Sequence, residues 1–282
     1  MSELVIKAPA KINLTLEVLG KRPDGFHEVR SVIQTVSLFD LLRFSRHDTV
    51  EITSSTVGFS AEKSLVSKTV DLVKEKSGYS GGVKIAVEKH IPLTSGLGGD
   101  SSDAAAVLQG LNQLWNLDWD KVKLSHLAAR LGSDVSFFLS GGTALMEGRG
   151  EKITPLKKLP SYAVLLINPP VDREPGKTAR VYAALKPTYF TDGSFTQMFI
   201  RELDSRNQIL PYLFNTFENI LFNKGSELEV YRDHLIKMGV QNVHVAGSGP
   251  VLYSLVADEQ KAKELLTVIK AQRMEAYLVS TI

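Results

Sequence analysis

Apolar and polar residues alternate along the first strand that the sequence predicts. The apolar side holds Ile12, Leu14, Leu16 and Val18, and the polar side holds Lys11, Asn13, Thr15 and Glu17. A period of two is typical of a half-buried strand, so Lys11 and Asn13 are expected to point the same way. Pro23-Asp24-Gly25 is a strong turn signal, and residues 29–38 are predicted to return as the second strand of a hairpin.

A glycine-rich loop lies between a predicted strand and a predicted helix. Residues 64–76 carry apolar side chains at helical spacing, and residues 83–87 alternate as a strand that leads to the loop. Residues 104–115 place their apolar side chains on one helical stripe, and Ser101 or Ser102 is expected to cap the start of this helix. The glycines are therefore predicted to lie at a helix N-terminus.

The rest of the chain predicts further helices and then alternating strands and helices. A helix over 124–131 stops at Gly132, where Ser133-Asp134 opens a short helical segment. The later elements are a strand over 162–167, a helix over 227–238, strands over 240–246 and 251–256, and a helix over 260–273. We expect an α+β protein with two lobes, residues 1–158 and 159–282, because 282 residues exceed the usual size of one compact core.

Composition narrows the classes of function. The chain carries 33 Lys and Arg against 31 Asp and Glu, and it has no basic block of the kind that binds nucleic acid. Its apolar runs are far shorter than the ~20 residues that span a bilayer, and its N-terminus does not resemble a signal peptide. We therefore expect a cytoplasmic protein without nucleic-acid or membrane partners. Cysteine is absent, and Asp24, His27 and Glu28 lack the spacing of a metal site.

The glycine-rich loop is the clearest chemical signal. It comprises Pro92, Leu93, Thr94, Ser95, Gly96, Leu97, Gly98, Gly99, Asp100, Ser101 and Ser102. Its glycines let backbone N–H groups approach an anion, and the following helix adds its positive end, so phosphate is the expected ligand. The loop is not a Walker A motif, which needs Gly-Lys-Ser/Thr, nor a dinucleotide motif, because Ser101 stands at the third glycine. A flexible surface turn is the alternative.

Other candidate residues are weaker signals when each is taken alone. Lys11 and Asn13 are suited to contacting a phosphoryl group during its transfer or a substrate hydroxyl, although such residues on a strand are usually just solvated. Asp134 is suited to orienting a substrate hydroxyl and to accepting its proton late in the reaction, although helix capping alone would explain this residue. Gly247-Ser248-Gly249 is either a tight turn or a backbone cradle for phosphate. Phosphoryl transfer requires a carboxylate near the acceptor, positioning and charge neutralisation, which these residues together would supply.

Taken together, these segments resemble a known family. The motifs, in chain order, are Ala8-Pro9-Ala10-Lys11-Ile12-Asn13-Leu14, Arg22-Pro23-Asp24-Gly25-Phe26-His27-Glu28, residues 96–105, residues 131–138 and Ala246-Gly247-Ser248-Gly249-Pro250. The chain resembles the GHMP (galactose, homoserine, mevalonate, phosphomevalonate) kinase superfamily from end to end. The second motif is similar to that of the 4-diphosphocytidyl-2-C-methyl-D-erythritol kinase family within it.

The resemblance implies a function and a set of site residues. It implies an ATP-dependent kinase, with Mg²⁺, acting on the 2-hydroxyl of 4-diphosphocytidyl-2-C-methyl-D-erythritol in the non-mevalonate (MEP) route to isoprenoid precursors. Lys11 and Asp134 would be the catalytic pair, and the glycine-rich loop would bind ATP. His27 would hydrogen-bond the edge of the cytosine ring, and that ring would lie between the aromatic faces of Phe26 and Tyr182. The implied acceptor-binding residues are Asn13, Phe26, His27, Thr178, Tyr182, Gly247, Ser248 and Gly249.

The resemblance also implies a fold and leaves two rival functions. The fold is the two-lobed GHMP kinase fold, with an N-terminal lobe like domain 2 of ribosomal protein S5 and a ferredoxin-like C-terminal lobe. We expect a monomer or a weak homodimer whose partners are ATP and the small-molecule acceptor. The rivals are a related kinase for mevalonate, homoserine or a sugar, and a nucleotide-binding protein without catalytic activity.

The chain departs from the family pattern at several positions. Phe26 stands where tyrosine is usual, which keeps the stacking face and loses a hydroxyl. Asp100 replaces a glycine of the phosphate loop, and we expect its carboxylate either to face outward or to reach Mg²⁺. Ser64 replaces an asparagine expected near adenine. Thr94 and Ser95 replace a glycine-rich start and should stiffen the loop.

Overall fold

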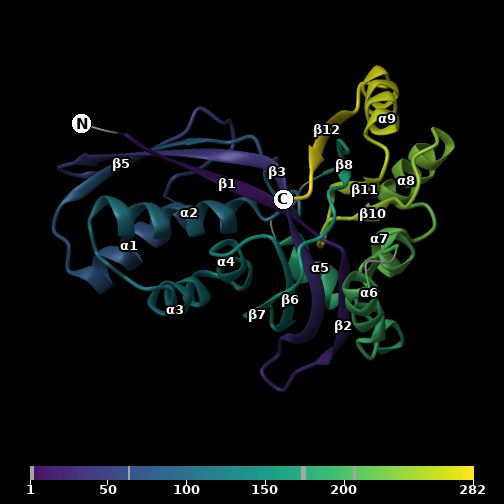
Figure 1. The fold of residues 1–282 in the computed structure, drawn as a ribbon, viewed down its shortest axis with the longest axis horizontal. Helices are drawn as coiled ribbons and strands as arrows, with labels where there is room; N and C mark the ends of the chain where they lie inside the picture. Colours follow the sequence, from purple (N-terminus) through teal and green to yellow (C-terminus); the bar gives the residue numbers. More distant parts are fainter. Residues whose placement is uncertain (1–2, 63, 173–175, 206–207) are drawn as a thin grey trace. The chain divides into compact units, whose positions relative to one another are not determined.

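The structure, a computed structural model, describes residues 3–62, 64–172, 176–205 and 208–282 (Figure 1). The chain forms two compact units, each built from separated stretches. The first unit contains Met1–Ala10, Leu38–Leu93 and Gly98–Gly141, and the second contains Lys11–Ser37, Thr94–Leu97 and Gly142–Ile282. Two strands, β1 (Leu4–Asn13) and β3 (His27–His47), contribute residues to both units. The expected division into residues 1–158 and 159–282 stays a prediction, because compact units and family domains need not coincide.

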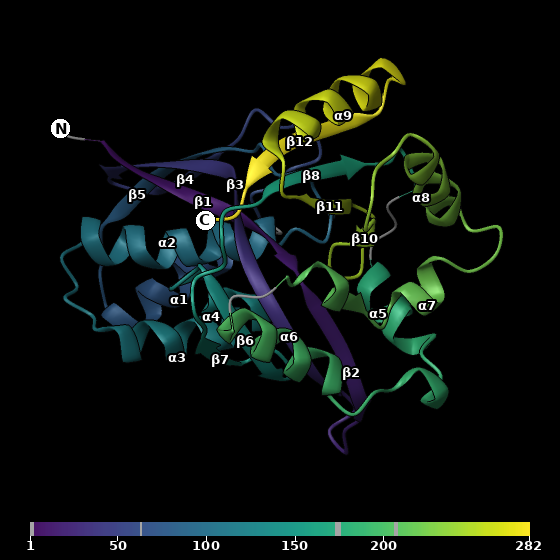
Figure 2. The ribbon, with the colours of Figure 1, turned by 45° about the vertical axis from the view of Figure 1, so that its right-hand side comes forward.

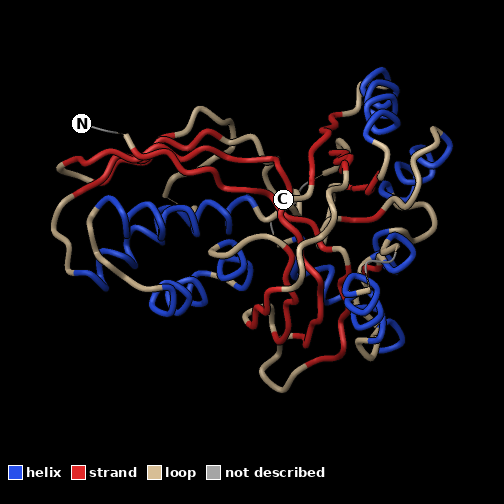
Figure 3. The backbone as a smooth tube through the Cα atoms, viewed as in Figure 1, coloured by secondary structure: helices blue, strands red, loops and turns tan. Residues whose placement is uncertain are grey.

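The first unit is a sheet with helices on one face. Strand β5 (Gly82–Glu88) pairs antiparallel with residues 41–47 of β3 and parallel with β4 (Val50–Thr53). The helices are α1 (Leu65–Ser77), α2 (Gly99–Leu114), α3 (Lys121–Leu131) and α4 (Ser133–Phe138). Figure 3 shows these four helices gathered on the same side of the strands. The core between the two layers includes Phe44, Val70, Val73, Ile85, Val107, Leu108 and Leu111.

The second unit contains two groups of strands. In one group, residues 27–34 of β3 pair with β2 (Thr15–Lys21) and β6 (Thr143–Gly148), β6 pairs with β7 (Lys152–Pro155), and β2 pairs with β9 (Phe214–Asn215). The other group is an antiparallel sheet in the order β10-β11-β8-β12. Its strands are β8 (Ala163–Asn168), β10 (His244–Val245), β11 (Leu252–Val256) and β12 (Glu275–Ser280).

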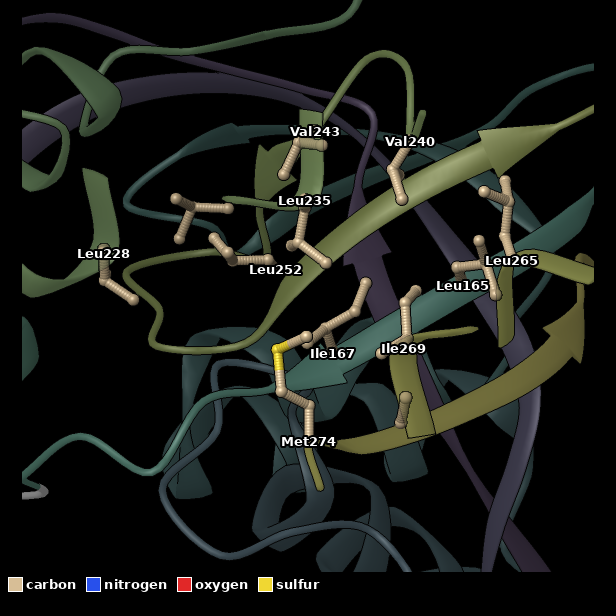
Figure 4. Close-up of a cluster of buried hydrophobic side chains, with 12 residues drawn as sticks. Leu165, Ile167, Leu228, Leu235, Val240, Val243, Leu252, Leu265, Ile269 and Met274 are labelled. Atoms are coloured by element: carbon tan, nitrogen blue, oxygen red, sulfur yellow. The ribbon is translucent and has the colours of Figure 1, made fainter. Parts of the chain in front are cut away.

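The described part of the second unit also contains five α-helices and two short 3-10 helices, Pro187–Tyr189 and Leu210–Tyr212. The α-helices are α5 (Lys177–Ala183), α6 (Ser194–Asp204), α7 (Glu218–Leu221), α8 (Glu227–Lys237) and α9 (Glu259–Ala271). Helices α8 and α9 lie beside the antiparallel sheet (Figure 2). Figure 4 shows the apolar side chains that pack between these helices and the sheet. A separate small cluster joins α5 to the hairpin and consists of Leu16, Val18, Val29, Val181 and Phe217.

The structure confirms the predicted α+β class and most predicted helices, and it corrects three local predictions. The first strand is not half-buried, because both of its faces are covered: Lys11 is 5% exposed and Ile12 is 0% exposed. Helix α2 begins earlier than expected, at Gly99, and among the described residues neither Ser101 nor Ser102 caps it. The strand expected over 240–246 is confined to His244–Val245. No helix in the described ranges has the length and apolar character needed to cross a membrane.

Candidate active site

A buried lysine and asparagine form the first part of the site, in the second unit. Lys11 Nζ donates a hydrogen bond of 2.7 Å to Asn13 Oδ1, and Asn13 Nδ2 lies 2.8 Å from Ser31 Oγ. Lys11 is 5% exposed and Asn13 is 1% exposed, so the alternative of a solvated strand surface is wrong. The period-two pattern brings the two side chains to one face of the strand. Burying an ammonium group costs free energy unless it is paired, which makes this residue pair a candidate for chemistry.

Two glycine turns meet beside this pair, also within the second unit. Lys11 N donates to Leu97 O at 2.9 Å, and Val251 N donates to Ser95 O at 3.2 Å. A Cβ added at Gly96 would lie 2.2 Å from Ala246 O, and a Cβ added at Gly247 would lie 3.2 Å from Lys11 Nζ. Glycine is required here because the two backbones approach closely and both φ angles are positive. The structure thus brings residues 94–97 and the turn at Gly247 together around Lys11.

Asn215 holds the second glycine turn, and no sequence pattern indicated it. Its Nδ2 donates to Val245 O at 2.9 Å and to Gly247 O at 2.8 Å, while its Oδ1 accepts from Phe217 N at 3.0 Å. The residue is 2% exposed. An isolated asparagine before a short helix has no periodicity or spacing that marks it, so only the fold identifies it as a support of the turn.

The predicted acceptor residues Thr178 and Ser248 are neighbours. Thr178 Oγ1 lies 2.8 Å from Ser248 Oγ, although the residues are 70 positions apart in the chain. Thr178 is at the start of α5, and Ser248 is in the second glycine turn. A Cβ added at Gly249 would lie 3.3 Å from Lys177 Nζ, so a lysine that sequence reasoning missed also lies at this turn. The arrangement groups two hydroxyls and a cation beside a backbone turn.

Aromatic rings gather around His27. Its ring stacks on Tyr182 with centroids 5.0 Å apart and meets Phe190 edge-on at 6.1 Å. Burial lowers the pKa of His27, and the positive charge of Lys21 lowers it further, so the neutral imidazole is favoured. A neutral imidazole carries one donor and one acceptor nitrogen. Tyr182 and Phe190 come from the segment around α5, so the structure brings two predicted residues, His27 and Tyr182, into direct contact.

Phe26 is placed differently from His27. It is 55% exposed, and the guanidinium of Arg149 lies over its ring, 4.9 Å from the centroid. A cation over an aromatic face is a favourable contact. Arg149 lies between β6 and β7, and sequence reasoning missed it because an arginine in a glycine-flanked turn resembles any solvated charge.

The phosphate-loop part of the first unit is the start of α2. Gly98 precedes the helix with φ of 76°, and the first-turn N–H groups have no partners within the helix. Ser102 is 1% exposed, and its Oγ has no hydrogen-bond partner among the described residues. Buried hydroxyls are normally paired, so this one is suited to an oxygen of a bound anion. The Asp100 side chain is 62% exposed, and its Oδ1 lies 3.9 Å from Lys89 Nζ, so its two expected roles, facing outward or reaching Mg²⁺, both stay predictions.

A buried charge cluster that the sequence did not reveal lies under this helix start. Lys89 Nζ is 2.5 Å from Asp40 Oδ2 and 2.8 Å from Asp103 Oδ2, and the three side chains are at most 2% exposed. Asp40 Oδ1 also accepts from the backbone N–H groups of His90 and Ile91 at 2.6 and 2.8 Å. Burial raises the pKa of Asp103 to about 7, with Lys89 opposing the rise and Asp40 adding to it. The cluster links β3, the end of β5 and α2.

Asp134 and Ser64 have clear positions in the first unit. Asp134 is half-buried in the first turn of α4, whose N-cap is Gly132. No side-chain hydrogen bond caps this helix in the described chain, so the capping explanation for Asp134 is wrong. Ser64 caps α1, because its Oγ accepts from Ser67 N at 3.3 Å. A serine with a structural role thus stands where the family was expected to place an asparagine.

The residues present fit a nucleotide phosphate. N–H groups without a partner in their own helix, a buried hydroxyl without a partner among the described residues, and a helix N-terminus are the features that bind phosphate oxygens. A separate protein cage for a metal ion is not observed, since the described residues include no group of three or more His, Cys, Asp or Glu that could hold one. Mg²⁺ at kinase sites is usually held by phosphates and one or two carboxylates, and Asp100 is a carboxylate beside the helix start.

Known proteins resemble this chain over its whole length. Residues 64–142 match the GHMP kinases N terminal domain. A 4-diphosphocytidyl-2-C-methyl-D-erythritol kinase of Dehalococcoides mccartyi is 44% identical over 99% of this chain and 98% of that protein. One of Bacillus cereus is 38% identical over 98% of this chain and 96% of that protein.

Solved structures agree with these relatives. A crystal structure of 4-(cytidine 5'-diphospho)-2C-methyl-D-erythritol kinase has a TM-score of 0.84 and 31% identity, with 99% of both chains covered. The L. major mevalonate kinase, in complex with R-mevalonate, has a TM-score of 0.77 at 15% identity, over 99% of this chain and 97% of that chain, which shows a shared fold. The expected two-lobed GHMP kinase fold is confirmed. The chain belongs to the 4-diphosphocytidyl-2-C-methyl-D-erythritol kinase family.

Proposed function

We propose that this chain transfers the γ-phosphate of ATP to the 2-hydroxyl of 4-diphosphocytidyl-2-C-methyl-D-erythritol, a step of the MEP route to isoprenoid precursors. The observation that carries the proposal is the full-length identity of 44% to a relative named for this activity. The resemblance of residues 22–28, which include Phe26 and His27, to the motif of this family also supports this acceptor over mevalonate, homoserine and sugars. A monomer or weak homodimer, and a cytoplasmic location, stay predictions.

The glycine-rich loop is proposed to hold the phosphates of ATP. The first-turn N–H groups of α2 and the hydroxyl of Ser102 would bind phosphate oxygens, and Asp100 would lie nearest to Mg²⁺. When bound, Mg²⁺ neutralises charge on the phosphates. Positioning and charge neutralisation are most of what a protein contributes to phosphoryl transfer.

Lys11 and Asp134 are proposed as the catalytic pair. The acceptor oxygen forms its bond to the γ-phosphorus while the bond from that phosphorus to the β–γ bridging oxygen breaks, and ADP leaves. Asp134 takes the proton of the acceptor hydroxyl, and Lys11 stabilises negative charge on the transferring group. Asn13, which pairs with Lys11 Nζ, helps to hold the acceptor.

The cytidine end of the acceptor is proposed to bind at the aromatic group. Cytosine would contact the rings of Tyr182 and Phe26 on the faces opposite to those that His27 and Arg149 cover. His27, with a lowered pKa, would offer one donor and one acceptor nitrogen to the cytosine edge. Thr178, Gly247, Ser248 and Gly249 would bind other polar atoms of the acceptor, because their hydroxyl and backbone groups gather at one turn.

The test is ATP consumption by the purified chain with the cytidine compound, mevalonate, homoserine and galactose offered separately. Turnover with the cytidine compound alone is expected, and turnover with another acceptor would contradict the assignment.

Asp134→Asn should keep the fold and lower kcat by about 10²–10⁴-fold, the usual contribution of an acid–base group. Asp120→Asn is the matched control, because Asp120 caps α3 in the same unit and asparagine caps equally well. Equal kcat in the two variants would remove Asp134 from the catalytic role.

A further inference from the structure

The side-chain amide of Asn13 is hydrogen-bonded at both ends inside the second unit. Its Oδ1 is 2.7 Å from Lys11 Nζ, and its Nδ2 is 2.8 Å from Ser31 Oγ. Asn13 is 1% exposed and Ser31 is 0% exposed. Since an amide has one accepting and one donating end, a 180° rotation would exchange the groups that face Lys11 and Ser31.

The hydrogen-bond chemistry of the neighbours fixes which end faces which residue. The ammonium of Lys11 can only donate, so the amide atom beside it must be the oxygen. The single hydroxyl hydrogen of Ser31 is directed at the carbonyl oxygen of Thr15, 2.5 Å away, and a carbonyl can only accept. Ser31 Oγ can therefore only accept from Asn13, so the amide atom beside it must be the NH₂ group. Two independent constraints give the same orientation.

The surrounding backbone keeps both residues in place. Tyr253 Oη donates to Asn13 O at 2.7 Å, and Leu14 N donates to Val32 O at 2.7 Å. Thr15 Oγ1 accepts from Val32 N at 2.9 Å, which ties the residue that receives the Ser31 hydrogen to the opposite strand. Ser31 lies on β3 opposite Met146 of β6, with no water-exposed surface to offer an alternative partner.

We propose that Ser31 is a positioning residue for the kinase reaction: it sets the amide of Asn13 so that Oδ1 faces and holds the ammonium of Lys11. The proposal rests on the proposed function, which assigns Lys11 and Asn13 to the acceptor and the transferring group. Ser31 acts through Asn13 and touches no reacting atom itself. Without its hydroxyl the amide is free to rotate, and an NH₂ group that faces an ammonium group repels it. Lys11 Nζ would then leave its place beside Gly247.

The first test compares substitutions of buried serines. Ser31→Ala should lower kcat about tenfold and leave the KM for ATP within twofold, the loss expected when a hydrogen bond to a charged group is misplaced. Ser31→Thr, which restores a hydroxyl on a strand, should recover most of kcat. Ser254→Ala is the matched control, because Ser254 is 1% exposed on β11 and donates one hydrogen bond of 2.6 Å to Gln241 O. A wild-type kcat for Ser31→Ala would overturn the proposal.

A double-mutant comparison separates positioning from a structural role. In an Asn13→Ala background, Ser31→Ala should change kcat less than twofold, because the amide that it orients is gone. The same tenfold loss in that background would show that Ser31 acts through the fold and would overturn the proposal. Should Ser31→Ala fail to fold, Ser31→Cys keeps the approximate volume with a much weaker hydrogen-bonding group and is compared in the same two backgrounds.

The proposed orientation of the Asn13 amide can also be tested without substrate and without turnover. With ¹⁵N in asparagine side chains, the NH₂ signal of Asn13 should be assigned by its loss in Asn13→Ala, and its protons should exchange slowly in the wild type. Exchange should be at least tenfold faster in Ser31→Ala and unchanged in Ser254→Ala. Slow exchange in Ser31→Ala would contradict the inferred orientation. If the wild type phosphorylates none of the acceptors, the proposed function fails while this measurement still decides the orientation.

Discussion

At Gly96 the backbone restricts the sequence in two ways, through its φ angle and through a close approach of another segment. Its φ is +84°, and an added Cβ would lie 2.2 Å from Ala246 O and 3.1 Å from Gly249 O. Both obstacles are backbone atoms of the second glycine turn, so no side-chain movement relieves them. Gly96→Ala should therefore lower the free energy of unfolding by about 2–4 kcal/mol, measured by denaturant titration, from strain plus displacement of the turn.

A control with the same backbone angle isolates the close approach. Gly225 has φ of +86°, and an added Cβ would meet nothing within 4 Å. Gly225→Ala should cost only about 1 kcal/mol, the penalty of the left-handed backbone alone. Equal losses in the two variants would mean that the turn moves freely and that the contact between the two glycine segments contributes no stability.

At the scale of elements, the buried cluster of Lys89, Asp40 and Asp103 joins two strands to α2 and makes stability depend on pH. The pKa of Asp103 is raised to about 7 in the folded chain, chiefly by burial, above the value of 3.8 of the free side chain. Between pH 4 and 7 the folded state therefore binds more protons than the unfolded state. The contribution of Asp103 to the free energy of unfolding then falls as the pH rises through this window and is constant above it.

Asp103→Asn should remove this slope, because asparagine stays neutral at every pH. The unfolding free energy of the variant minus that of the wild type should rise by about 3–4 kcal/mol from pH 4 to 7.5, measured by denaturant titration at each pH. Asp192→Asn is a control of opposite sign. The hydrogen bonds of Ser194 lower the pKa of Asp192 below its ordinary value, so this variant should lose stability relative to the wild type as the pH rises to about 5, and the difference should be constant above that pH. A flat difference for Asp103→Asn would show that Asp103 is charged throughout.

At the scale of the whole molecule, each unit is built from separated stretches of chain, so no contiguous fragment contains one complete unit without residues of the other. The fragment 159–282 keeps all twelve buried residues of the core in Figure 4, which lie between Leu165 and Ala276. It loses Leu16, Val18 and Val29, the partners of Val181 and Phe217 in the smaller cluster. In hydrogen–deuterium exchange, β8, β11, β12 and α9 of the fragment should stay protected, while α5 should exchange within the dead time.

The matched control is the same set of peptides in the whole chain. There α5 should be protected, because Val181 packs on the hairpin of β2 and β3. If α5 were equally protected in the fragment, residues 159–282 would form a self-sufficient domain, as the expected boundary near residue 158 supposes. If β8 and α9 also lost protection, the core in Figure 4 would depend on residues outside the fragment.

Local periodicity and spacing in the sequence were sufficient to predict helices α1 to α4, α8 and α9, the hairpin, and the position of the glycine-rich loop between a strand and a helix. Helix α8 begins at Glu227, the residue expected, and α1 begins one residue after its predicted start, because apolar spacing and caps act within one or two turns. The motifs also indicated the family, because glycines and polar residues at fixed spacing reflect chemistry that few folds require.

Only the tertiary structure decided which residues are buried and which separated segments meet. The pairing of Thr178 with Ser248, the support of Gly247 by Asn215 and the cluster around Lys89 join positions up to 70 residues apart. A sequence pattern records which face of an element is apolar, but it does not record what covers the polar face. The burial of Lys11, Asn13 and Ser31 on such a face therefore depends on long-range packing, and so does the orientation of the Asn13 amide.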